Sequence, residues 1–237
     1  MRQNFITTDD GSHTLFMPEL NEHYHSTNGA LQESKHVFIE AGLKIAFESK
    51  SITNHDNHSI NILEIGFGTG LNAYLTLLES EKYQKNLFYH AIELYPLPKE
   101  VYQKLNYPAL LQQQYSIEME KASDLFMQLH SSPWEKSASI TTKFNLLKQR
   151  FDLSKPSQFN PNRSYDLIYF DAFAPDKQPT MWEEEIFRKI YTLCSRDAIF
   201  VTYCAKGAVR RMLQNVGFQM ERLPGPPGKR EILRGRK

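Results

Sequence analysis

Three glycines at alternate positions, Gly66, Gly68 and Gly70, follow an apolar run over residues 60–65 and precede an amphipathic stretch that begins at Leu71. This order predicts a β-strand that enters a helix through a tight turn, the place where open α/β sheets bind nucleotide-like ligands. Glycine permits positive φ angles and a close approach of the ligand to the backbone. The alternative is a turn that binds nothing, but the density of glycine favours a ligand site.

The spacing of this turn distinguishes two classes of ligand. The dinucleotide fingerprint is G-x-G-x-x-G, and Leu71 stands where its last glycine belongs, so an NAD-dependent oxidoreductase is disfavoured. Glu64 stands just ahead of the glycines, where a carboxylate would repel a pyrophosphate but suits hydroxyl groups and positive charge. S-adenosylmethionine carries a ribose, an ammonium and a sulfonium but no phosphate. We therefore expect S-adenosylmethionine as the cofactor.

Strand and helix patterns alternate along the rest of the chain. The expected strands are 60–65, 87–94, one strand or hairpin within 140–151, 165–171, 197–203, 218–223 and 230–234, and the expected helices are 71–80, 99–105, 122–130, 181–194 and 205–215. This order predicts an α/β fold with a doubly wound, mostly parallel, seven-stranded sheet. The turn over 224–228 is too short for a parallel crossover, so the last two strands should form an antiparallel edge pair. Such a sheet matches the class I methyltransferase (Rossmann-like) fold.

The N-terminal part of the chain predicts an extension to this sheet. Asp10-Gly11 is a strong hairpin signal. The flanking patterns predict strands over 5–7 and 14–16, a helix that includes 37–47 and ends near residue 50, and a polar loop over 51–59. We therefore divide the chain into a hairpin-and-helix extension, residues 1–50, and a methyltransferase domain, residues 51–237, which together form one compact unit.

Composition excludes several classes of protein. The 237 residues are 41% apolar with 15 Phe and 12 Tyr, enough for a substantial core. Cys194 and Cys204 are too far apart for a redox pair and are expected to be buried thiols. Close histidine pairs occur at His23, His25, His55 and His58, but no third ligand has metal-site spacing, so no metal is expected. With neither a membrane-spanning stretch nor a signal peptide, we expect a soluble, cytoplasmic protein.

Acidic residues also follow three further predicted strands. Glu93 lies roughly twenty residues past the glycine turn, the offset at which an acid meets ribose hydroxyls in nucleotide-binding α/β folds. Asp152 could reach the adenine from the end of the third strand, although a simple loop acid explains it equally well. Asp171 ends the fourth strand, where a carboxylate could orient an amine nucleophile and accept its proton. The alternatives are a solvated acid for Glu93 and a loop cap for Asp171. The residues expected to wall this pocket are Phe173, Pro175 and Trp182.

The C-terminal region is basic although the whole chain carries a net charge of only +1. The basic residues are Lys206, Arg210, Arg211, Arg222, Lys229, Arg230, Arg234, Arg236 and Lys237, against Glu221 and Glu231. A local basic surface suits a nucleic-acid substrate. An ordinary solvated face with a charged tail explains the same charges, and charge alone supports both interpretations.

Several motifs together resemble a known family. They are Gly66-Phe67-Gly68-Thr69-Gly70-Leu71-Asn72, Asp171-Ala172-Phe173-Ala174-Pro175, Pro179-Thr180-Met181-Trp182 and Gly225-Pro226-Pro227-Gly228-Lys229-Arg230-Glu231, with Tyr24, Asn28-Gly29 and Val37-Phe38-Ile39 near the N-terminus. They are similar to the methyltransferase part of the bifunctional MnmC family, whose stand-alone members are called MnmD. The resemblance covers nearly the whole chain, and the block from Asp171 to Trp182 is much more specific than the glycine turn.

The resemblance implies an S-adenosylmethionine-dependent enzyme that methylates the 5-aminomethyl group of a tRNA wobble uridine, usually a 2-thiouridine, to 5-methylaminomethyl. The partner would be a tRNA anticodon stem-loop, with no membrane and no metal, and a monomer is compatible with this role. The implied cofactor-binding residues are Glu64, Gly66, Phe67, Gly68, Gly70, Asn72, Glu93, Asp152 and Asp171. Asp171 would also face the amine as the catalytic residue. The implied substrate-binding residues are Tyr24, Asn28, Phe173, Pro175, Trp182, Lys229 and Arg230.

Two features depart from the family pattern. The bifunctional proteins carry a second, FAD-dependent oxidoreductase half, for which this sequence has no room, so we expect another protein to supply that step or the aminomethyl form to arise directly. The usual Gly-Asp of the third strand is Phe151-Asp152 here. Two other functions stay open: a methyltransferase for a small-molecule amine, and a catalytically idle RNA-binding relative. The presence of Glu64, Glu93 and Asp171 speaks against the idle relative.

Overall fold

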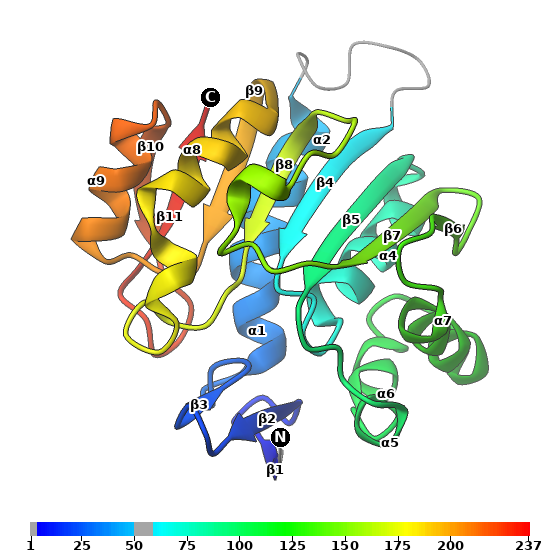
Figure 1. The fold of residues 1–237 in the computed structure, drawn as a ribbon. Helices are drawn as coiled ribbons and strands as arrows, with labels where there is room; N and C mark the ends of the chain where they lie inside the picture. The colour runs from blue at the N-terminus through cyan, green and yellow to red at the C-terminus, as the bar shows by residue number, and fades with distance from the viewer. Residues whose placement is uncertain (1–3, 50–58) are drawn as a thin grey trace.

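The computed structural model describes residues 4–49 and 59–237 and shows a central β-sheet with helices on both faces (Figure 1). Eight strands form the sheet in the order β10-β11-β9-β8-β4-β5-β7-β6. They are β4 (Ile60–Ile65), β5 (Leu87–Glu93), β6 (Ala138–Ser139), β7 (Phe144–Arg150), β8 (Tyr165–Phe170), β9 (Cys194–Thr202), β10 (Gln219–Pro224) and β11 (Glu231–Arg236). Strands β9, β8, β4, β5 and β7 run parallel, which confirms the doubly wound fold class.

The edges of the sheet are antiparallel. β11 pairs antiparallel with both β9 and β10, so β10 is the edge strand and the expected C-terminal pair is confirmed. β6 pairs antiparallel with β7 at the opposite edge. The sequence predicts seven strands, and the eighth is β6. A strand of two residues is too short to show the alternating pattern by which strands are recognised.

Helices pack on both faces of the sheet. α8 (Glu184–Leu193) and α9 (Gly207–Asn215) cover one face, and a long N-terminal helix, α4 (Leu71–Tyr83) and α7 (Met119–Ser131) cover the other (Figure 1). The N-terminal helix comprises α1 (Ala30–Ser34), η1 (Lys35–Leu43) and α2 (Lys44–Glu48), and the shorter helices are α5 (Lys99–Tyr102), α6 (Tyr107–Leu111), η2 (Pro156–Gln158) and η3 (Pro179–Trp182).

Two helices differ from the sequence expectation. The segment η1 is π-helical, and its wider turns bury six of its nine residues, more than one α-helical stripe would place against the sheet. The single helix expected over 181–194 is instead the 3₁₀ turn η3 followed by α8. The interruption occurs at Glu183, whose extended backbone separates the two. α6 was not expected from the sequence.

A small N-terminal sheet lies beside the carboxyl ends of the parallel strands (Figure 1). Its strands are β1 (Asn4–Thr7), β2 (His13–Met17) and β3 (Glu22–His23), and the hairpin expected at Asp10-Gly11 is confirmed. The Asp10 carboxylate accepts a hydrogen bond from the Gln32 N–H (2.9 Å) and so connects the hairpin to the start of the N-terminal helix. A domain boundary at residue 50 stays a prediction, and residues 51–58 of the expected loop lie outside the described residues.

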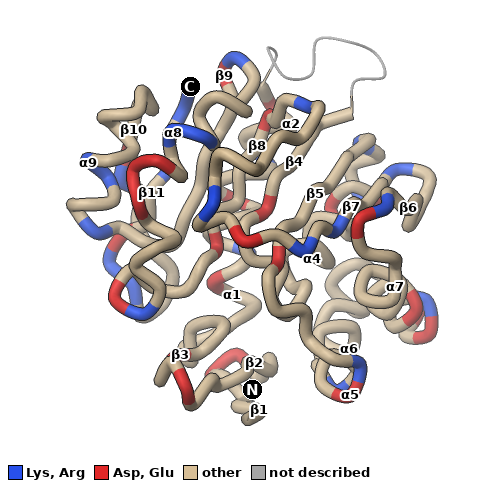
Figure 2. Tube along the Cα trace, in the orientation of Figure 1, with Lys and Arg blue, Asp and Glu red and all other residues tan. Residues whose placement is uncertain are grey.

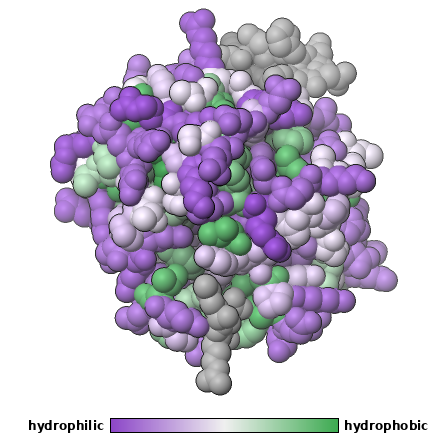
Figure 3. Space-filling model, viewed as in Figure 1, coloured by the Kyte–Doolittle hydropathy of each residue, from purple (hydrophilic) through white to green (hydrophobic). Residues whose placement is uncertain are grey.

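The core of the protein consists of two apolar clusters, one on each face of the sheet. Cys194 and Cys204 belong to one of them and are free, buried thiols, as expected. The surface seen in Figure 3 is mainly hydrophilic, with apolar side chains showing near its centre. In the part of the chain that the structure describes, no helix is long and apolar enough to cross a membrane.

Three buried histidines make folding stability depend on pH. Burial lowers the pKa of His25 and His90 to about 4 and that of His130 to about 3, from the ordinary 6.5. The unfolded chain therefore binds protons first as the pH falls below 6.5, and at pH 4 each histidine costs the fold about 3 kcal/mol. We expect these histidines to lower stability, measured by urea titration, as the pH falls from 6.5 to 4, a slope that the raised pKa of Asp171 partly offsets. His90→Gln should flatten this slope, whereas the same change at the partly exposed His23 should not. An unchanged slope in the His90→Gln variant would contradict this expectation.

Candidate active site

The glycine turn and Asp171 are locked together at the carboxyl ends of β4 and β8. The Asp171 N–H donates to the Ile65 carbonyl (2.9 Å). Gly66 has a φ of 92°, and a Cβ on it would lie only 2.5 Å from the Asp171 carbonyl oxygen, so only glycine fits here. The turn therefore sets the position of Asp171 as well as forming the loop that was expected to hold a cofactor.

A cavity of about 810 Å³ lies over this junction, within the size range of cofactor sites. One side is formed by the carboxyl ends of the parallel strands, and the other by the N-terminal segment that follows β3. The residues expected to hold the cofactor that line it are Gly66, Phe67, Gly68, Asn72, Glu93, Asp152 and Asp171. The glycine turn at the topological switch point and the acids Glu93, Asp152 and Asp171 therefore line the same cavity.

Hydrogen bonds hold the carboxylates of Glu93 and Asp152 in fixed orientations. Glu93 accepts hydrogen bonds from the Gly68 N–H (3.0 Å) and the Tyr95 N–H (2.9 Å), which fix its carboxylate beside the glycine turn. Asp152 accepts hydrogen bonds from the hydroxyl (2.6 Å) and the N–H (3.1 Å) of Ser154, and the hydroxyl bond leads the causes that lower its pKa. Both side chains keep lone pairs that can accept from ribose hydroxyls or an adenine amino group.

Asp171 has the electrostatic environment of a proton acceptor. Its carboxylate accepts a hydrogen bond from the Asn72 side-chain amide (2.8 Å). Burial, followed by the negative charge of Glu33, raises the pKa of Asp171 to about 7, while Asn72 and Lys229 oppose the rise. A carboxyl group with this pKa is substantially ionised at neutral pH and can still take up a proton there.

Glu64 lies beneath the cavity and does not contact it. Its side chain is fully buried, and burial and the charge of Asp171 raise its pKa well above the ordinary value. Tyr89 and Asn72 lie close enough to moderate that shift, but no described residue makes a well-formed hydrogen bond to either carboxyl oxygen. Burial therefore disfavours the charged form of Glu64, and the charge-based role expected for it stays a prediction.

Gly70 also lies outside the cavity lining. A Cβ on Gly70 would meet the His130 Nε2 at 2.7 Å, so this glycine makes room for a buried ring rather than for a ligand. His130 donates from Nε2 to the Thr69 carbonyl (3.1 Å) and stacks on Tyr102. The last glycine of the turn thus serves the packing of α7 against the loop.

The residues expected to bind the substrate divide into three groups. Those that line the cavity are Tyr24, Asn28, Phe173 and Lys229. Pro175 and Arg230 line a shallow adjoining groove of about 410 Å³ that Lys206 and Lys229 also border. Trp182, expected to wall the pocket, is buried behind it, and its indole N–H donates to the Phe173 carbonyl (2.7 Å). The Trp182 ring packs against Phe170 and Tyr203, and a buried indole N–H needs a hydrogen-bond acceptor. Its bond to the Phe173 carbonyl therefore supports the loop that carries Phe173.

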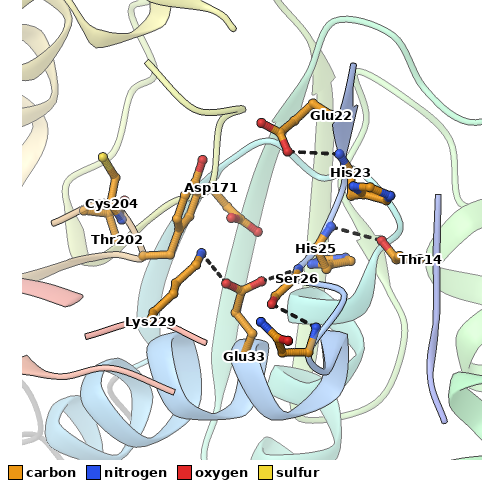
Figure 4. A network of polar contacts seen from close by, with 12 residues as sticks. Thr14, Glu22, His23, His25, Ser26, Glu33, Asp171, Thr202, Cys204 and Lys229 are labelled. Atoms are coloured by element: carbon orange, nitrogen blue, oxygen red, sulfur yellow. Dashed lines mark hydrogen bonds and ion pairs between the residues drawn. The ribbon is translucent and has the colours of Figure 1, made fainter. Parts of the chain in front are cut away.

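Sequence reasoning missed a polar group that the N-terminal helix brings into the cavity (Figure 4). Glu33 is buried, accepts a hydrogen bond from the Ser26 N–H (2.8 Å) and forms an ion pair with Lys229. The Lys229 ammonium lies 3.9 Å from the centroid of the Tyr203 ring. A signal was present, because Glu33 stands one helical turn before Val37 and therefore shares its buried face.

Four of the nine C-terminal basic residues are paired with acids. The pairs are Lys206 with Asp176 (2.6 Å), Arg222 with Glu231 (3.4 Å), Arg234 with Glu221 (2.5 Å) and Lys229 with Glu33. Figure 2 shows basic and acidic segments mixed across this part of the chain. The basic stretch is thus less of a uniform cationic surface than the sequence suggests. Over the residues that the structure describes, no group of three or more His, Cys, Asp or Glu side chains is arranged to hold a metal ion.

The doubly wound sheet, its glycine turn and the acids at its strand ends define an S-adenosylmethionine-dependent methyltransferase. A family model described as "S-adenosyl-L-methionine-dependent methyltransferase" matches residues 150–237. Curated relatives are named "tRNA 5-methylaminomethyl-2-thiouridine biosynthesis bifunctional protein MnmC". The one from Actinobacillus pleuropneumoniae is 30% identical over 96% of this chain, and the one from Burkholderia multivorans is 27% identical over 96%. Over nearly its whole length the chain is similar to one part of these MnmC proteins.

The extent of these matches differs between the relatives. The chain spans about a third (34%) of the length of both curated relatives. The crystal structure of MnmC2 from Aquifex aeolicus superposes with a TM-score of 0.74 at 22% identity, covering 99% of this chain and 70% of that one, which shows that the two share a fold.

Proposed function

We propose that this protein transfers a methyl group from S-adenosylmethionine to the amine of a 5-aminomethyl-(2-thio)uridine at the wobble position of tRNA. The observation that carries the proposal is Asp171, fixed by Asn72 at the junction of the glycine turn and the substrate side of the cavity. The relatives' printed name, which refers to the biosynthesis of 5-methylaminomethyl-2-thiouridine in tRNA, supports this substrate. Such an activity would place the protein in the cytoplasm.

The residues present fit this cofactor. Glu93 and Asp152 would receive its ribose and adenine, and the backbone of the glycine turn would lie against its amino-acid end. When bound, S-adenosylmethionine supplies an electrophilic methyl group on a sulfonium. Direct repulsion of pyrophosphate by Glu64 is not part of the proposed role, because that side chain is buried and does not line the cavity.

The protein's own part in the reaction is to align the amine and remove its proton. An alkyl amine arrives largely as an ammonium, which has no lone pair with which to attack. Asp171 would accept one ammonium proton and so leave the nitrogen with the lone pair that it needs to take up the methyl group supplied by bound S-adenosylmethionine. Alignment can contribute about 7–11 kcal/mol to such a displacement. Tyr24 and Phe173, whose rings pack with centroids 5.1 Å apart, would confine the uracil ring beside the reacting atoms.

The substrate's backbone would follow the groove beside the cavity. Lys206 and Arg230 are exposed there, next to the loop that carries Pro175. Cationic side chains around a cavity that accepts one base suit a flipped-out nucleotide of a single-stranded loop. We propose the methyl transfer alone for this chain, with the aminomethyl group supplied by a separate activity.

The test uses the whole chain, S-adenosylmethionine and an anticodon stem-loop RNA that carries 5-aminomethyl-2-thiouridine at the wobble position. Mass analysis of the digested nucleosides should show the gain of one methyl group on that nucleoside. Methylation of free 5-aminomethyluridine at an equal rate would instead favour a small-molecule methyltransferase. Calorimetry that detects no S-adenosylmethionine binding would favour an idle RNA-binding relative.

A further inference from the structure

We propose that Glu33, Asp171 and Tyr203 form a receptor for a primary ammonium group, and that the Lys229 side chain fills it until the amine of the substrate takes its place. Because that amine belongs to the substrate proposed above, the receptor rests on the proposed function. It adds Glu33 as a residue that selects an amine, and it makes Lys229 a displaceable occupant of the site rather than an RNA contact.

The surroundings of the Lys229 ammonium are those of a bound alkylammonium ion. It pairs with the Glu33 carboxylate on one side and lies 3.9 Å from the centroid of the Tyr203 ring on the other. A carboxylate with an aromatic face is a combination that holds cations in protein sites. All three side chains line the cavity that also contains Asp171, and Figure 4 shows Lys229 and Glu33 beside it.

Glu33 is prepared to receive a cation. Its side chain is only 8% exposed, and one carboxylate oxygen is already bound by the Ser26 N–H (2.8 Å). The other oxygen is buried and has the Lys229 ammonium as its ion-pair partner, but no described residue gives it a hydrogen bond of good geometry. A buried carboxylate that loses its cation pays a large desolvation cost, so Glu33 should retain either Lys229 or a replacement of the same charge.

Lys229 can leave without a change in the backbone. Its N–H donates to the Pro226 carbonyl (2.9 Å), and the Gly225 N–H donates to the Arg230 carbonyl (3.0 Å), so a tight turn fixes the main chain. The Lys229 side chain is 29% exposed and borders the adjoining groove as well as the cavity. Rotation about its flexible stem would move the ammonium from the receptor into that groove.

The receptor also lies within electrostatic reach of the proton acceptor. The charge of Glu33 raises the pKa of Asp171, and the charge of Lys229 lowers it. When Lys229 withdraws, the ammonium of the substrate lies between two carboxylates, one that holds it and one that accepts its proton. The methionine end of the cofactor carries a primary ammonium too. We assign the receptor to the substrate, because Glu33, Tyr203 and Lys229 lie on other elements than the glycine turn, Glu93 and Asp152.

The test compares two anticodon stem-loop RNAs that differ only at the wobble uridine, one with a 5-aminomethyl and one with a 5-hydroxymethyl group. Dissociation constants are measured with S-adenosylhomocysteine bound, and their ratio gives the preference for the amine. Lys229→Met should raise this preference about tenfold by removing the competing ammonium, and Glu33→Gln should lower it about tenfold. Lys206→Met, a change at an exposed lysine of the neighbouring groove, should leave the ratio unchanged.

Controls separate the receptor from other roles of these residues. The double variant Glu33→Gln with Lys229→Met removes both members of the ion pair, so its preference can be compared if Lys229→Met alone is unstable. An equal loss of affinity for both RNAs in Lys229→Met would make Lys229 an RNA contact and overturn the proposal. A changed affinity for S-adenosylmethionine, measured separately by calorimetry, with an unmoved ratio would assign the receptor to the cofactor and also overturn it.

The same samples separate this inference from the proposed function. If the wild-type protein methylates the aminomethyl RNA and neither variant moves the ratio, the receptor is wrong and the proposed function stands. If the wild-type protein neither binds nor methylates that RNA, both are wrong.

Discussion

We expect Asp171→Asn to lower kcat for methyl transfer by about 10²–10⁴-fold while S-adenosylmethionine still binds. An amide cannot accept the proton that the amine must lose, and removal of a positioned general base costs a factor of this size. The Asn side chain keeps the shape of Asp171, and its carbonyl oxygen can still accept the hydrogen bond from Asn72. Single-turnover rates with the aminomethyl RNA measure this step apart from RNA binding and product release.

The pH dependence of the methyl-transfer rate is a second test of Asp171 as the proton acceptor. Burial and Glu33 raise the pKa of Asp171 to about 7, so below this pH the carboxyl group already carries a proton and cannot accept another. The wild-type rate should therefore rise with pH, with an inflection near 7, and the Asp171→Asn variant should lose that inflection. The amine of the substrate also becomes more reactive as pH rises, and that trend should persist in the variant.

Asp176→Asn is the matched control for this experiment. Asp176 lies on the same loop, is exposed and pairs with Lys206 rather than with any cavity residue. We expect nearly wild-type rates from it. A comparable loss of rate in both variants would assign the effect to loop structure, and an active Asp171→Asn variant would rule out proton acceptance by this residue.

We expect Gly66→Ala to destabilise the protein by about 3 kcal/mol and to abolish measurable S-adenosylmethionine binding. The residue has a φ of 92°, which costs an L-amino acid about 1–2 kcal/mol, and the added Cβ would lie 2.5 Å from the Asp171 carbonyl oxygen. Relief of that contact requires the ends of β4 and β8 to separate, at a further cost of about 1–3 kcal/mol. The same separation displaces Asp171 and the backbone of the glycine turn.

Gly11→Ala separates the cost of the positive φ angle from the cost of the steric clash at Gly66. Gly11 has a φ of 80°, but nothing lies within 4 Å of the position that a Cβ would take, and the residue lies in the N-terminal hairpin away from the cavity lining. This variant should lose only about 1 kcal/mol and keep its cofactor affinity. Urea titration and calorimetry measure both quantities. Equal behaviour of the two variants would show that the contact with Asp171 has no energetic importance.

Much of the fold could be predicted because its causes are local. Apolar runs of strand length, helical periodicity and the glycine turn between them are properties of neighbouring residues. They predict β4, α4 and a mostly parallel direction of the strands in the sheet. The positions of Glu93 and Asp171 also follow, since the carboxyl ends of parallel strands share one edge. The two-residue β6 and the π-helical η1 could not be predicted, because neither has a local pattern of its own.

The amino-acid sequence by itself determined the glycine turn, the strand-end acids and the family whose motifs they resemble. Only the tertiary structure decided the charge states and partners of the side chains. Glu64 stands beside the glycine motif, yet the fold buries it outside the cavity lining and raises its pKa. Glu33 and Lys229 lie near opposite ends of the sequence and meet only because the N-terminal helix and the turn before β11 flank the same cavity. Burial and ion pairing depend on what distant segments bring into contact, and periodicity predicts the face on which a residue lies but not what it meets there.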